Sequence, residues 1–187
     1  MNDKKTDLRY IKTEKIIRNT FLEMLKEMPY EKIEIKTLAE RAYINRKTFY
    51  LHYNSLSDLL NSLLEEIYEE IMQNISELEF PRDIAQIIRS IFSAFNSMSD
   101  EKWKLIYAAH FYTGLDFEKY IIKYSWNFSA DFGTDSLNRD LVLSFFLSGL
   151  ESIFDFWSKN KNKITFDEVT DRAIILLKAG INGYGEF

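Results

Sequence analysis

The sequence predicts an all-α protein, and three observations lead to this expectation. The 187 residues include only six glycines and two prolines, so long stretches contain no residue that breaks a helix. In most of these stretches, apolar residues recur every three or four positions, which is the spacing of one helix face. With 46% apolar and 16% aromatic residues, the chain has enough hydrophobic side chain for a sizeable core. We expect about nine helices.

The N-terminal part is expected to hold one long helix and then two very short ones. The first covers about residues 7–28 and ends before Pro29. The short helices cover about residues 36–42 and 46–52, and Asn45 is placed to cap the second of them. A fourth helix follows, because Ser55 and Asp58 have the spacing of a capping-box variant ahead of a continuous apolar stripe.

The C-terminal part is expected to form five further helices after Pro81. Their approximate ranges are 82–98, 100–111, 116–130, 137–158 and 167–182. Thr165 and Glu168 form a capping box at the start of the last helix. The final two helices are apolar on more than one side, so each must be buried on more than one side, within the chain or against a second subunit.

Charge is distributed unevenly along the chain. The net charge is −5, but residues 1–57 hold 12 Lys+Arg and 8 Asp+Glu, which gives +4, and residues 58–187 hold 12 and 21, which gives −9. Only the N-terminal part therefore has the charge that suits a polyanion. Charge also varies along solvated helix faces for no functional reason. This asymmetry alone therefore does not decide whether the N-terminal part binds nucleic acid or only has a charged surface.

The composition excludes several classes of protein. Without cysteine the chain has no disulfide and no thiolate-ligated metal site. The charged start lacks the apolar core of a secretion signal, and the apolar runs fall short of a membrane span. We therefore expect a cytoplasmic protein with no membrane association, no metal and no cofactor. We also expect no enzyme, because no catalytic or nucleotide-binding motif is present and the two histidines, His52 and His110, fall in different predicted domains.

Residues 36–58 have the layout of a helix-turn-helix, two short helices joined by a tight turn. On the second short helix, Arg46, Lys47 and Tyr50 fall on one side. Phe49 and Tyr53, four residues apart, fall on the other. One side can then pack in a core while the other lies in the major groove of DNA.

Residues 33–60, with the run Thr-Phe-Tyr-Leu-His-Tyr, resemble the DNA-binding domain of the TetR (tetracycline repressor) family of bacterial regulators. The resemblance covers about residues 8–64, and residues 146–158 are similar to the penultimate helix of one branch of the family. It implies an all-helical homodimer with a three-helix DNA-binding domain at 1–57 and a ligand-binding and dimerisation domain at 58–187. It also implies the DNA-binding residues, which are Lys36, Thr37, Asn45, Arg46, Lys47, Thr48, Tyr50, Leu51 and His52.

Three residues depart from the family pattern. Tyr43 stands at the turn position that is usually glycine, where a positive φ would strain a bulky residue. Leu56 replaces a lysine that contacts phosphate, and Glu34 replaces the usual Ser or Thr cap of the second helix. These departures leave an alternative open, in which the protein keeps the fold but regulates through a protein partner, with DNA binding weak or lost.

The C-terminal half carries two further expectations. Aromatic side chains are candidates to line a pocket for an aromatic or apolar small molecule, although most aromatics fill cores; the candidates are Trp103, Tyr107, His110, Phe111, Tyr120, Trp126 and Phe145. Small residues at four-residue spacing on the penultimate helix favour close helix packing, either in a dimer interface or within one subunit. The candidate interface residues are Leu141, Phe145, Ser148, Gly149, Ser152, Phe156, Ile174, Leu177 and Ile181.

Together these expectations describe a ligand-responsive transcriptional regulator. It would act as a repressor and bind a near-palindromic duplex operator as a homodimer, with one recognition helix for each half-site.

Overall fold

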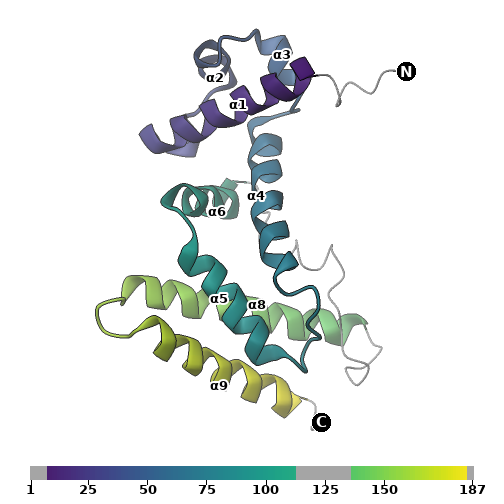
Figure 1. Cartoon of the computed structure of the whole chain (residues 1–187), viewed down its shortest axis with the longest axis vertical. Coiled ribbons are helices and arrows are strands. Elements are labelled where there is room, and N and C mark those ends of the chain that lie inside the picture. Colours follow the sequence, from purple (N-terminus) through teal and green to yellow (C-terminus); the bar gives the residue numbers. More distant parts are fainter. Residues whose placement is uncertain (1–7, 113–135, 185–187) are drawn as a thin grey trace. The chain divides into compact units, whose positions relative to one another are not determined.

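The computed structural model describes residues 8–112 and 136–184 (Figure 1). In these ranges the chain forms helices and no strand, which confirms the all-α prediction. The helices are α1 (Leu8–Glu27), α2 (Ile35–Arg41), α3 (Arg46–Tyr50), α4 (Leu56–Gln73), α5 (Ile84–Ser97), α6 (Asp100–Tyr112), α8 (Ser136–Lys159) and α9 (Phe166–Tyr184), with a 3-10 helix η2 (Tyr30–Lys32). The helix expected at 116–130 lies outside the described residues.

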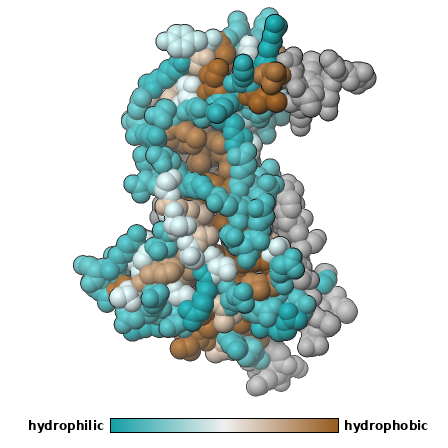
Figure 2. Space-filling view, viewed as in Figure 1, coloured by the Kyte–Doolittle hydropathy of each residue, from teal (hydrophilic) through white to brown (hydrophobic). Residues whose placement is uncertain are grey.

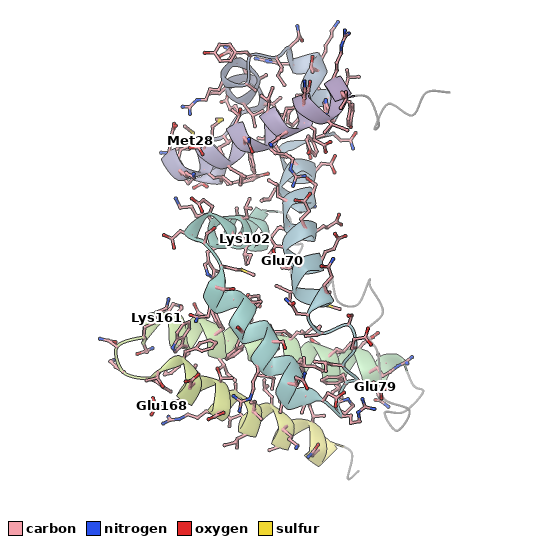
Figure 3. All side chains as sticks on the ribbon, in the orientation of Figure 1. Met28, Glu70, Glu79, Lys102, Lys161 and Glu168 are labelled. Carbon is pink, nitrogen blue, oxygen red and sulfur yellow. The ribbon has the colours of Figure 1, made fainter. Side chains whose placement is uncertain are left out.

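Side chains at the predicted caps fix where two of these helices begin. At α4 the Asp58 N–H donates to Ser55 Oγ at 3.0 Å, and the Asp58 carboxylate accepts from the Asn54 N–H at 2.8 Å. At α9 the Glu168 N–H donates to Thr165 Oγ1, and Glu168 Oε2 accepts from the Thr165 N–H at 2.9 Å (Figure 3). Each arrangement satisfies backbone N–H groups that the first turn of a helix leaves without a partner.

The chain divides into two compact units. The first contains Met1–Glu66 and Ser99–Leu115, and the second contains Ile67–Met98 and Asp116–Phe187. The division expected at residues 57 and 58 followed the end of the helix-turn-helix motif, whereas the compact units divide inside α4. Helix α6 belongs to the first unit because it packs against α1, where Lys26 Nζ lies 3.4 Å from Glu101 Oε1.

The core of the first unit is built on the apolar stripe of α1. Helix α1 packs against α2, and α2 packs against α3. The side chains that are fully buried here have no accessible surface and come from all four N-terminal helices: Ile17, Phe21, Met24, Leu38, Phe49, Leu59, Leu60 and Leu64. Burying such side chains is the main contribution to the stability of this four-helix arrangement.

The second unit is built around the α8–α9 hairpin, in which α9 packs against both α8 and α5. A Cβ placed on Gly149 of α8 would lie 2.6 Å from Leu177 Cδ2 of α9, so glycine permits the two helices to approach closely here. An aromatic cluster joins the helices at the hairpin end, and the Lys161 ammonium in the connecting loop lies 4.7 Å from the centre of the Trp157 ring (Figure 3). The rings of the cluster are Phe92, Phe95, Phe154, Trp157 and Phe166.

Helix α8 is apolar over a longer stretch than we expected from the sequence, where the apolar runs fall short of a membrane span. Among the described residues, Leu137–Lys159 is long and apolar enough to cross a membrane by length and composition alone. Core helices pass the same test, and α8 buries one full side in the second unit through Leu143, Phe146 and Leu150. Its length and apolar character are therefore weak evidence for a membrane span.

Candidate nucleic-acid interface

Helix α3 is short, and a side-chain cap fixes its start. Asn45 lies in extended conformation, and its Oδ1 accepts a hydrogen bond from the Lys47 N–H at 2.9 Å. Its carbonyl oxygen accepts from the Thr48 N–H at 2.8 Å. This confirms Asn45 as the cap of the helix that follows the turn.

The two sides of α3 have opposite environments. Phe49 is fully buried and Tyr53 is 5% exposed, which confirms their predicted place in the core. Arg46 and Lys47 are exposed, and Tyr50 is exposed over 55% of its surface. The core side therefore holds the helix on the rest of the unit, while the other side presents cationic and hydrogen-bonding groups to solvent.

Helix α2 shows the same division. Leu38, Ala39 and the C-cap residue Ala42 are buried. Lys36 is exposed and Thr37 is half-buried near the start of the helix. Both polar residues thus remain available at the surface of the unit.

The turn between α2 and α3 has a left-handed residue. Tyr43 has a φ of 53°, which confirms that this position requires the conformation that glycine usually supplies. The other two departures lie at helix starts. Glu34 is the N-cap of α2 but makes no side-chain capping hydrogen bond, and Leu56 is the first residue of α4.

A layer of aromatic and charged side chains fastens the end of α3 to α1. The His52 ring stacks on the Tyr10 ring, with their centroids 3.9 Å apart. The Tyr53 hydroxyl donates to Glu14 Oε1 at 3.1 Å, and Arg18 forms an ion pair with Glu66 of α4. These contacts hold the position of α3 relative to the two long helices of the unit.

Sequence reasoning missed the α1 residues of this layer. Tyr10, Glu14 and Arg18 recur every four residues, which places them on one face of α1. That spacing was a usable signal, but it is also common on solvated helix faces. Their partners, His52 and Tyr53, could be assigned only from tertiary contacts.

Burial and charge change the ionisation of this layer. Burial lowers the pKa of His52, and the negative charge of Glu14 opposes that effect to a smaller extent. Burial raises the pKa of Tyr53 and of Tyr10. His52 Nδ1 is buried and has no hydrogen-bond partner within the described part of the chain. His52 is therefore held in its neutral form more strongly than a solvated histidine.

The candidate pocket residues are only partly described. Trp103 of α6 is half-buried in the first unit, whereas Phe145 of α8 belongs to the second unit and is 51% exposed. The Phe145 ring lies over Gly180 of α9, where an added Cβ would be 2.8 Å from its Cζ atom. The remaining candidates lie outside the described side chains: Tyr107, His110, Phe111, Tyr120 and Trp126.

The candidate interface residues of α8 and α9 fall into two groups. Leu177 and Ile181 are buried within the chain, and Gly149 accommodates Leu177, so these three residues take part in packing inside the subunit. Ile174 is half-buried. The exposed members share one side of α8: Leu141, Phe145, Ser148, Ser152 and Phe156.

Comparison with known proteins gives one sequence relative and several structural ones. No protein-family model matches the chain. An uncharacterised HTH-type transcriptional regulator of Bacillus subtilis, YxbF, is 27% identical over 84 residues. The match covers 44% of this chain and only 22% of that protein, so the chain spans a minor part of the relative's length.

Solved structures match over most of the chain. A TetR transcriptional regulator of Streptococcus agalactiae has a TM-score of 0.65 at 22% identity, covering 90% of this chain and 95% of that one. NalD, the secondary repressor of the MexAB-OprM multidrug efflux pump in Pseudomonas aeruginosa, has a TM-score of 0.62 at 14% identity, covering 91% and 97%. The agreement with these structures over about nine tenths of the chain shows that it has the fold of the TetR transcriptional regulators.

Proposed function

We propose that the protein is a transcriptional regulator of the TetR type that binds duplex DNA as a homodimer, represses transcription and responds to a small molecule. The observation that carries the DNA-binding part is the two-sided α3, which buries Phe49 and leaves Arg46, Lys47 and Tyr50 exposed. A helix held by its core side can enter a major groove with its polar side. Such a protein acts in the cytoplasm, where bacterial DNA lies.

Each residue of the proposed interface has a role that its chemistry suits. Arg46 has the planar fork that binds guanine O6 and N7, and Lys47 supplies a second cation beside it. Thr48, Tyr50 and His52 are hydrogen-bonding groups for the sugar-phosphate backbone. The remaining members of the proposed interface support the edge of the contact from α2, the cap and the end of α3: Lys36, Thr37, Asn45 and Leu51.

The charge distribution supports the same interface. The net charge of +4 over residues 1–57 contrasts with −9 over residues 58–187. A polyanion attracts the first and repels the second, so electrostatics alone would orient the protein with its N-terminal part toward DNA.

The exposed side of α8 supports a homodimer. Leu141, Phe145 and Phe156 are exposed over 58%, 51% and 55% of their surfaces, and they recur with Ser148 and Ser152 at intervals of three and four residues. Helix α9 adds Ile175 and Leu176, and hydrophobic surface lies over α9 in the space-filling view (Figure 2). A second copy placed two-fold symmetrically would cover this surface with the same residues.

Helix α4 supports a response to ligand, because it runs from the first unit into the second. A molecule that binds the second unit and displaces α4 would change the separation of the two recognition helices. Ligand and DNA would then oppose each other through one conformational equilibrium.

The test of DNA binding is the selection of duplexes by the protein from a random library, followed by titration of the selected duplex. We expect Arg46→Ala to weaken binding by about 10- to 100-fold, because one bidentate base contact contributes about 1–3 kcal/mol. We expect Lys47→Ala to reduce the slope of log Kd against log salt concentration by about one, which corresponds to the loss of one phosphate contact.

Arg89→Ala is the matched control. Arg89 is an exposed arginine on α5 whose ion pair with Asp171 lies outside the proposed interface, so its loss should leave DNA affinity unchanged. A dimeric, folded protein that selects no duplex at low salt would contradict the proposal. Regulation that persists in Arg46→Ala and Tyr50→Ala would favour the alternative, a regulator that acts through a protein partner.

A further inference from the structure

The backbone of the turn between α2 and α3 demands a left-handed residue. The Tyr43 N–H donates to the Glu40 carbonyl at 3.2 Å, and the Ile44 N–H donates to the Ala39 carbonyl at 3.0 Å. This pair of hydrogen bonds is the Schellman ending of a helix, in which the residue after the C-cap adopts positive φ. Tyr43 does so at 53°. Glycine is the usual residue here because a Cβ in this conformation crowds the backbone.

Among the described residues, no packing offsets this backbone cost. The Tyr43 side chain is 96% exposed, so it gains no burial in return for its conformation. Tyr50 and Leu51 are also exposed, over 55% and 67% of their surfaces. The segment from the turn to the C-cap of α3 thus presents three large side chains to solvent, and the same segment contains cationic Arg46. Large exposed apolar and aromatic side chains are typical of a surface that contacts another molecule.

We propose that Tyr43 is a further DNA-contacting residue, whose hydroxyl donates a hydrogen bond to a phosphate at the edge of the groove that α3 enters. This inference rests on the proposed function. Tyr43 precedes Arg46 by three residues, so their Cα atoms lie within about 11 Å of each other. With Arg46 at the base edges, a sugar-phosphate strand that borders the groove passes beside the turn. Tyrosine is among the side chains that donate to phosphate oxygens, and here its ring already points into solvent.

Two variants of Tyr43 test the contact on the duplex that the wild-type protein selects from a random library. Tyr43→Phe removes only the hydroxyl, and Tyr43→Gly removes the side chain and its backbone strain. We expect each variant to bind about tenfold more weakly, since each loses a hydrogen bond to a charged group. Tyrosine is neutral, so the salt dependence of binding should stay unchanged in both, in contrast to Lys47→Ala.

Thermal unfolding separates a lost contact from a folding defect. Tyr43→Gly should raise the melting temperature while it weakens DNA binding, because glycine adopts the left-handed conformation without strain. Tyr43→Phe should melt as the wild type does, so its loss of affinity cannot come from folding.

The outcomes distinguish this inference from the proposed function. If both Tyr43 variants bind as tightly as the wild type while Arg46→Ala binds weakly, Tyr43 makes no contact and the proposed function stands. If Tyr43→Phe alone binds as the wild type does, the hydroxyl contact is wrong. If the wild-type protein selects no duplex, the proposed function and this inference both fail.

Discussion

Two residues after the end of α3, His52 is half-buried beside the proposed DNA surface. Its ring stacks on Tyr10 of α1 while Tyr53, the next residue, bonds to Glu14 of the same helix. The residue is therefore part of the contact that fixes α3 on α1 as well as a candidate for a phosphate contact. Protonation of His52 would affect both roles.

Burial of His52 predicts a loss of stability in mild acid. The pKa of the folded-state His52 is lowered below its ordinary value of about 6.5 by burial. As pH falls through 6.5, the unfolded chain binds a proton that the folded protein resists. The free energy of unfolding therefore falls, and the loss is complete once the pH is below the lowered pKa.

A comparison with His52→Phe measures this effect. Phenylalanine keeps a ring against Tyr10 but does not titrate, and all carboxylates stay the same. Urea unfolding at about pH 7 and pH 5 should show a larger drop in unfolding free energy for the wild type than for the variant. Equal drops in the two proteins would show that His52 is not held neutral by its environment.

At the scale of elements, Gly149 is one position where α8 packs tightly against α9. An added Cβ at this position would meet the tip of Leu177 at 2.6 Å, whereas an added Cβ at Gly183 of α9 would have no neighbour within 4 Å. The two glycines share a helical backbone but differ in surroundings. They provide a matched pair for testing the packing of the hairpin.

We expect Gly149→Val to lower the free energy of unfolding by about 1–3 kcal/mol, because its branched side chain overpacks the contact with Leu177. Gly183→Val should change it by less than about 0.5 kcal/mol, as expected for an exposed site. Chemical denaturation of both variants provides the measurement. A Gly149→Val protein as stable as the wild type would mean that α8 and α9 can separate at this point without cost.

At the scale of the whole molecule, the exposed side of α8 predicts how two copies associate. The buried side of the helix, with Phe146 and Leu150, belongs to the subunit core. The exposed side, with Leu141 and Phe156, has the apolar character of an interface core rather than of a solvated surface. A homodimer would also place two copies of α3 for two half-sites of an operator.

A charge on the exposed side of α8 should therefore give a monomer. We expect Leu141→Lys and Phe156→Lys each to weaken dimerisation at least about 100-fold, since burying an unpaired charge costs several kcal/mol. Analytical ultracentrifugation over a range of concentrations measures the change. The DNA affinity of these variants should fall as dimerisation weakens, because each monomer would bind one half-site alone.

Asp140→Lys is the control, because it brings the same cation one residue away, outside the apolar stripe. It should leave the dimer intact. Dimers that survive in Leu141→Lys and Phe156→Lys would place the subunit contact elsewhere.

Much of the local structure could be predicted from the sequence. Helix periodicity, the Asn45 cap and the Thr165–Glu168 capping box depend on residues at most a few positions apart, and short-range hydrogen bonds and side-chain direction decide them. The opposite environments of Phe49 and Arg46 follow in the same way from the helix period. Even the strained turn at Tyr43 could be predicted, because the motif requires a left-handed residue at that position.

The tertiary structure alone decided which apolar residues face a neighbour within the chain and which remain exposed. Leu177 and Phe156 look alike in a pattern of apolar spacing, yet one is 3% exposed and the other 55%. The stack of Tyr10 on His52 joins residues far apart in the chain, and so does the pairing of Arg18 with Glu66. Sequence fixes the direction in which a side chain leaves its helix, but the packing of distant helices determines what it meets there.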